Sequence, residues 1–159
     1  TSGIDDTYDK YVFKFYNMHP ATDSVPLKFN MSTDSGSNYN VTKTTTFFRA
    51  YHNESDSAAA LGYDTGADLA QSTSFQELSA YIGNGADENC SGTLTLFSPS
   101  STTFVKHFMS VTNGVEDRDY SWNSYIAGYG NTTSAVDAIR FQFSSGNIDS
   151  GVIKLYGIS

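Results

Sequence analysis

Apolar and polar side chains alternate residue by residue in several runs of this chain, and this alternation constrains its fold more than any other feature. The clearest case is the run 8–18, where Tyr11, Phe13 and Phe15 are separated by single residues. A period of two places side chains alternately on the two faces of a β-strand, and aromatic and β-branched residues favour strands. Each such run is therefore predicted to be a strand with one buried face.

Similar runs recur along the chain, separated by clusters of Gly, Pro, Ser, Asn and Asp that are typical of turns. No amphipathic run of helix length lies between them, so a parallel sheet with crossover helices is not expected. The pattern predicts an all-β, two-sheet antiparallel sandwich of jelly-roll type, formed as a single domain over residues 1–159. The predicted strands cover residues 8–18, 25–32, 41–51, 92–98, 103–111, 120–129, 138–143 and 152–158.

The stretch 52–91 departs from this pattern because its residues are mostly polar and small. Its segments 57–61 and 75–78 fit either one helical turn or a short strand, and a short strand is predicted near 67–73. Structureless loops of this length are uncommon inside compact domains and are often functional. We therefore expect a long polar insertion between strands of the sandwich.

Acidic residues outnumber basic ones by 17 to 9, which gives a formal net charge of -8 spread along the chain. Nucleic-acid binding usually needs a stripe of basic residues, and the sequence contains none, so no nucleic-acid partner is expected. No apolar run approaches the ~20 residues of a membrane-spanning helix, so no membrane insertion is expected. The single cysteine, Cys90, excludes an internal disulfide, and its setting predicts a half-buried small residue rather than a nucleophile.

The closing run of the chain carries a specific likeness. Residues 138–158 read AIRFQFSSGNIDSGVIKLYGI, and the segments 1–5, 19–23, 48–51 and 113–130 fit the same pattern. This pattern resembles a family of bacteriophage virion proteins that is common in marine phages. The likeness covers nearly the whole chain, and the closing run is its most specific part.

The resemblance implies a jelly-roll sandwich on the surface of a virion, as a capsid decoration protein, a head or tail appendage or a tail-fibre module. It implies a homotrimer that contacts other virion proteins, and it implies no catalytic motif, so the chain is expected not to be an enzyme. In that family a segment usually precedes the equivalent of residues 1–5, and an upstream attachment segment or first strand is expected here too. Two alternatives stay open: a receptor-binding tail-fibre tip that recognises host surface glycans, and a secreted carbohydrate-binding module or glycosidase.

The residues that could perform chemistry form no catalytic pattern. His19, His52 and His107 lack the spacing of a zinc site, and no serine lies in a nucleophile elbow. A glycosidase would need two carboxyl groups ~5–9.5 Å apart across a cleft, which a sequence does not place. No catalytic residue is therefore assigned.

Carboxylates gather in the runs 5–9 and 87–88 and in the run that contains Glu116, Asp117 and Asp119. Calcium takes six to eight oxygen ligands, which the loops of a sandwich can supply. Glu116, Asp117 and Asp119 are therefore the candidate calcium ligands, with a solvated acidic loop as the alternative. No other cofactor is expected.

Four aromatic residues lie close together in one predicted strand: Tyr120, Trp122, Tyr125 and Tyr129. Rings beside amide side chains are typical of sites that bind sugars, since a ring stacks on the apolar face of a sugar. These four residues are the candidate surface for a glycan or a protein partner. The alternative is an ordinary sandwich core together with a subunit interface.

Overall fold

The computed structural model describes residues 3–159. Within that range the chain forms ten strands, and no helix is long and apolar enough to cross a membrane. The strands are β1 (Lys10–Pro20), β2 (Leu27–Ser32), β3 (Lys43–Asn53), β4 (Ala59–Tyr63), β5 (Gln76–Glu77), β6 (Cys90–Phe97), β7 (Lys106–Glu116), β8 (Tyr120–Gly130), β9 (Ala138–Phe143) and β10 (Ile148–Ile158).

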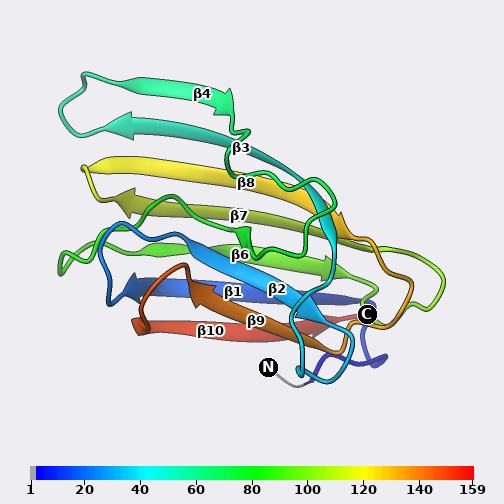
Figure 1. The fold of residues 1–159 in the computed structure, drawn as a ribbon. Coiled ribbons are helices and arrows are strands. Elements are labelled where there is room, and N and C mark those ends of the chain that lie inside the picture. The colour runs from blue at the N-terminus through cyan, green and yellow to red at the C-terminus, as the bar shows by residue number, and fades with distance from the viewer. Residues whose placement is uncertain (1–2) are drawn as a thin grey trace.

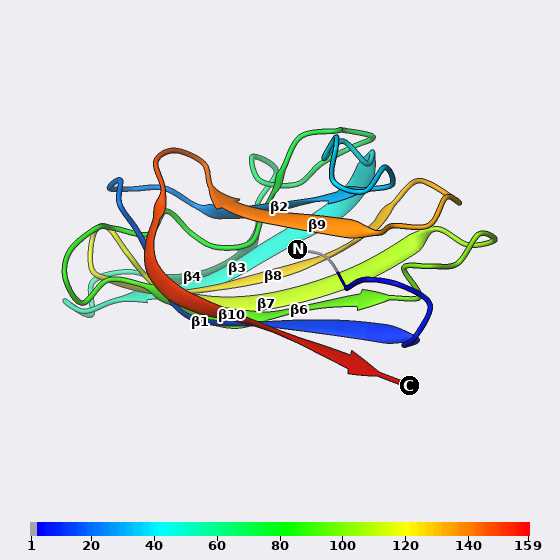
Figure 2. The same cartoon turned by 90° about the horizontal axis from the view of Figure 1, so that it is seen from below.

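The strands form two sheets that lie one above the other (Figures 1 and 2). The large sheet has seven strands in the order β10-β1-β6-β7-β8-β3-β4, and the small sheet has three in the order β5-β2-β9. All strand pairs are antiparallel. The predicted two-sheet antiparallel sandwich is confirmed, whereas its jelly-roll type stays a prediction.

The core lies between the two sheets and is built from the alternating residues that the sequence singles out. Tyr11, Phe13 and Phe15 of β1 are each at most 1% exposed, as alternation along that strand predicts. Across the sandwich, the ring of Phe29 on β2 meets the ring of Phe108 on β7 edge to face at 4.9 Å. The alternation therefore determines which face of each strand is buried, and aromatic contacts join the two sheets.

The polar stretch 52–91 contributes strands to both sheets. The end of β3 leads into β4, which forms one edge of the large sheet, and β5 then pairs with β2 at the edge of the small sheet. The segments 57–61 and 75–78 thus take part in strands rather than helical turns. The short strand predicted near 67–73 is wrong, because only an isolated bridge between Ser72 and Lys43 forms there.

The start of β10 and the end of β7 differ from their predicted positions, because polar residues there join the hydrogen bonding between strands. The last strand begins at Ile148, four residues before the predicted start, because Ile148 and Ser150 pair with the end of β1. Likewise β7 runs on to Glu116, since its whole length pairs with β8. Backbone hydrogen bonds do not depend on hydropathy, so the apolar pattern alone does not mark these ends.

Candidate functional site: the outer face of the large sheet

The face of the large sheet that points away from the small sheet is not covered by any described part of the chain (Figure 2). Over β6, β7, β8, β3 and β4, the side chains on this face include no Asp, Glu, Lys or Arg. We call this surface the outer face. Its residues alternate with the buried ones and are Ser91, Thr93, Thr95, Phe97, His107, Met109, Val111, Asn113, Val115, Ser121, Asn123, Tyr125, Ala127, Tyr129, Thr44, Thr46, Phe48, Ala50, His52, Ala59, Leu61 and Tyr63.

Large apolar side chains on this face stand in solvent. Met109 and Val111 on β7 are 58% and 45% exposed, and Leu61 on β4 is 74% exposed. Phe48 on β3 stacks on Tyr125 of β8 with ring centroids 4.9 Å apart and planes 7° from parallel. The face is thus uncharged and mixed, with apolar side chains among Ser, Thr, Asn and His, and exposed apolar side chains gathered on one face favour an interaction site.

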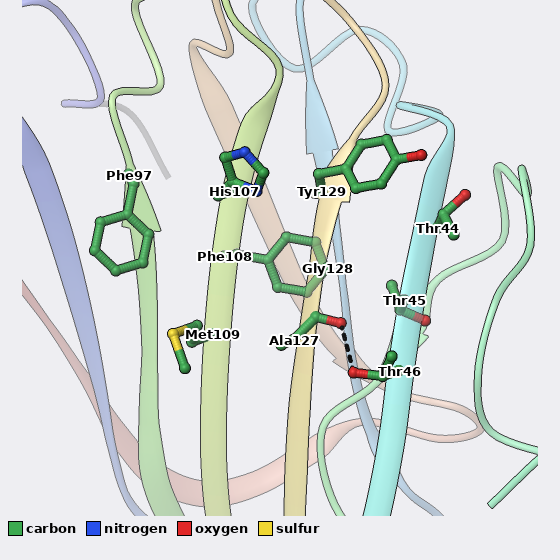
Figure 3. Close-up of a pocket in the computed structure, with 10 residues that line it drawn as sticks. All are labelled: Thr44, Thr45, Thr46, Phe97, His107, Phe108, Met109, Ala127, Gly128 and Tyr129. Atoms are coloured by element: carbon green, nitrogen blue, oxygen red, sulfur yellow. Dashed lines mark hydrogen bonds between the residues drawn. The ribbon is translucent and has the colours of Figure 1, made fainter.

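A shallow depression of about 480 Å³ lies near one end of the outer face (Figure 3). Its rim includes Phe97, His107, Met109 and Tyr129, which come from three neighbouring strands. Its middle holds Ala127, whose methyl group fills little of the space between these larger side chains. The depression has the size and character to receive an apolar side chain from another molecule.

The four aromatic residues predicted as a glycan or partner surface do not share one face. Tyr125 and Tyr129 lie on the outer face, where they pair with Val111 and His107 of β7. Tyr120 and Trp122 point to the opposite side of the sheet, as the buried state of Trp122 shows. A strand alternates its side chains, so residues an odd number of positions apart are divided between its two faces.

Trp122 has no free ring surface of the kind that a sugar needs. Its ring stacks on Tyr51 at 5.0 Å, and the guanidinium of Arg49 lies 4.8 Å from its centroid. Tyr51 also meets Tyr120 edge to face at 5.5 Å. These rings therefore pack against one another, as the alternative of an ordinary sandwich core predicts. Only Tyr125 and Tyr129 remain available to a partner.

Two of the three candidate calcium ligands, Glu116 and Asp117, contact an arginine. Glu116 is 2% exposed and accepts hydrogen bonds from the guanidinium of Arg118, which also lies 3.5 Å from a carboxylate oxygen of Asp117. Asp119 forms the turn between β7 and β8 with a positive φ of 61°. Within residues 3–159, no group of three His, Cys, Asp or Glu side chains could hold a metal ion. The structure therefore does not bring these carboxylates together as a cation site.

The histidines have separate surroundings. His19 Nδ1 lies 2.6 Å from the carbonyl oxygen of Glu88, and His52 Nε2 lies 2.9 Å from Asp56 on the surface. His107 stands at the rim of the depression, with its ring 6.2 Å from that of Tyr129. In the described part of the chain, none of them is hydrogen-bonded to a serine or cysteine.

Cys90 is 1% exposed, which is more buried than the sequence suggests, and burial raises the pKa of its thiol to about 12. Because the thiolate is the reactive form, the folded protein should not react with a thiol reagent at pH 8. We expect rapid labelling only in denaturant, measured by mass spectrometry of the iodoacetamide adduct. Labelling of the native protein at the rate of a free thiol would contradict the buried position.

Comparison with protein-family models, curated proteins and solved structures gives no match for this chain. The outer face therefore has to be interpreted from its own chemistry. The sequence analysis used the apolar residues that alternate along each strand and overlooked the residues between them, which form the outer face. The signal was present: the alternate positions Thr44, Thr46 and Phe48 on one strand, and His107 and Met109 on another, carry no formal charge.

Proposed function

We propose that this domain is a non-enzymatic structural module of a bacteriophage particle, of jelly-roll type, that associates with further copies of itself on the particle surface. The observation that carries the proposal is the uncharged, partly aromatic outer face. The likeness of residues 138–158 to the closing run of phage virion proteins supports the setting.

The charge of the chain favours another copy as the occupant of this face. Two copies that each carry a net charge of -8 repel one another through most of their surfaces. No strand position on the outer face carries a carboxylate, and the two that reach its edge, Asp56 and Asp68, contact His52 and Tyr63 beside β4. Copies that meet over β6, β7 and β8 therefore do so with the least repulsion. A strongly basic partner would find no opposite charge on this face.

The size of the outer face also suits a stable contact. With strands ~4.8 Å apart and a rise of ~3.3 Å per residue, the five strands cover roughly 700 Å². A specific protein interface buries ~800 Å² on each partner, while most crystal contacts bury less than half of that. The depression around Ala127 offers a place for an apolar side chain of the second copy.

Self-association is tested by placing a charge on this face. We expect the wild-type domain to be an oligomer at micromolar concentration, with the homotrimer as the state that the resemblance implies. Met109→Asp should weaken association at least ~tenfold, because a carboxylate would be buried against an apolar surface. Light scattering after size-exclusion chromatography measures the mass directly, against 17.3 kDa for one chain.

Tyr81→Asp is the matched control, since Tyr81 is 51% exposed but lies outside the outer face. This variant should keep the mass of the wild type. A wild-type domain that is monomeric at micromolar concentration would overturn self-association. Equal loss of association in both variants would show that the net charge of the chain, rather than the outer face, controls self-association.

A further inference from the structure

Three lysines that have no carboxylate partner within residues 3–159 lie beside the outer face, on the strands β1 and β10. Lys14 on β1 and Lys154 on β10 are directly opposite each other in the antiparallel register, and Lys10 lies on the same side of β1. In the regular part of the ladder, the outward positions around this pair are Val12 and Tyr16 on β1 and Val152, Tyr156 and Ile158 on β10, none of them acidic. We call this surface the lysine corner.

The other basic residues show how unusual this corner is. Lys28, Arg49 and Arg118 each pair with a carboxylate, and Lys43 and Lys106 are buried against carbonyl and amide oxygens. That leaves four of the nine basic side chains without a carboxylate partner among the described residues, the three of the corner and Arg140. In a chain with 17 carboxylates, an external anion bound at this corner would offset the repulsion between lysines that no carboxylate of the described chain contacts.

The register makes this arrangement costly for the isolated fold. Like charges directly opposite one another on neighbouring strands destabilise a sheet. Two tyrosines flank the lysine pair: Lys14 Nζ lies 5.4 Å from the ring centroid of Tyr156, and Lys154 Nζ lies 5.4 Å from that of Tyr16. Both rings are about 40% exposed, at 43% and 40%, so they still offer surface to a ligand.

We propose that the lysine corner binds an acidic polysaccharide, a chain of sugars that bear carboxylate or sulfate groups. The ammonium groups of Lys14 and Lys154 pair with the anionic group, and Tyr16 and Tyr156 stack on the apolar faces of the neighbouring sugar rings. The exposed rings favour a sugar over an acidic protein loop, because a carboxylate alone needs only the lysines. This site uses none of the outer-face residues and does not depend on self-association.

The test is titration calorimetry at low salt with a polyuronate oligosaccharide and with a sulfated oligosaccharide, beside a neutral oligosaccharide of equal length. We expect the wild type to bind at least one acidic oligosaccharide and not the neutral one, with an affinity that falls as salt is added. Lys14→Gln/Lys154→Gln should weaken binding at least ~tenfold. Tyr16→Leu/Tyr156→Leu should weaken it by a similar factor if the rings stack on sugars.

Lys28→Gln/Arg140→Gln is the matched control, because it removes two positive charges from other strands. It should bind like the wild type, and the melting temperature of each variant checks that it is folded. The proposal is overturned if no acidic oligosaccharide binds, if the control loses as much affinity as the lysine variant, or if binding survives the tyrosine variant. It is also overturned if the lysine variant loses self-association instead, since the occupant would then be an acidic loop of a second copy.

Self-association through the outer face and polysaccharide binding at the lysine corner can be disproved independently of each other. Met109→Asp should keep its affinity for the acidic oligosaccharide, because Met109 lies two strands away from β1 in the large sheet. The lysine variant should keep the oligomeric mass of the wild type. Loss of oligosaccharide binding in Met109→Asp would show that the site forms only between copies, which would overturn the site as proposed within one chain.

Discussion

Replacing Phe29 with alanine should lower the free energy of unfolding by about 3–5 kcal/mol, which is typical for removing a buried phenylalanine. Phe29 is fully buried on the middle strand of the small sheet. Its ring contacts Phe108 of the large sheet at 4.9 Å and lies 6.4 Å from the ring of Phe141 on β9. The substitution therefore leaves a cavity between the two sheets and removes an aromatic contact that joins them.

Urea denaturation followed by tryptophan fluorescence measures this change. Phe104→Ala is the matched control, because Phe104 is 71% exposed and its loss leaves no cavity. The control should stay within about 0.5 kcal/mol of the wild type, as is usual for surface substitutions. A Phe29→Ala variant as stable as the control would mean that the two sheets do not pack through this ring.

The stability of the wild type should rise by about 2 kcal/mol between pH 7 and pH 9, and most of this rise should come from Lys43. The side chain of Lys43 is fully buried, and its ammonium donates to Asn30 Oδ1 at 2.5 Å and to the carbonyl of Val41 at 2.8 Å. Burial lowers the pKa of Lys43 from 10.5 to about 7. Between these two values the unfolded chain holds the proton and the folded chain releases it, so folding is favoured as the pH rises.

Urea unfolding at pH 7, 8 and 9 gives the slope of the free energy of unfolding against pH. Lys43→Met should remove most of the rise, and the remainder belongs to Lys106, whose pKa is also lowered by burial. Lys28→Met should keep the slope of the wild type, because Lys28 pairs with Glu77 at the surface. The series stops at pH 9 because burial raises the pKa of the Cys90 thiol in the folded protein. At higher pH the unfolded chain loses this proton while the folded chain keeps it, which lowers the stability and offsets the effect of Lys43. An unchanged slope in Lys43→Met would contradict a buried lysine as its source.

The candidate sites show where sequence reasoning ends. The sequence places Tyr120, Trp122, Tyr125 and Tyr129 together, but alternation along one strand separates them into a pair packed on the inner side of the sheet and a half-buried pair on its outer face. It also groups Glu116 with its acidic neighbours, although Arg118 occupies that carboxylate in the fold. Nearness in sequence does not imply a shared surface, because a strand sends successive side chains to opposite sides.

The sequence by itself determined the fold class and the inward face of most strands. The reason is local: an alternation such as Tyr11, Phe13 and Phe15 leaves one way to bury the apolar side of a strand. Only the tertiary structure decided which strands become neighbours, and that choice creates both candidate surfaces. Lys14 and Lys154 are 140 residues apart in the chain, yet they face each other because β10 returns to pair with β1. The outer face likewise exists only because five strands that are each half apolar share one sheet while the small sheet covers the other side.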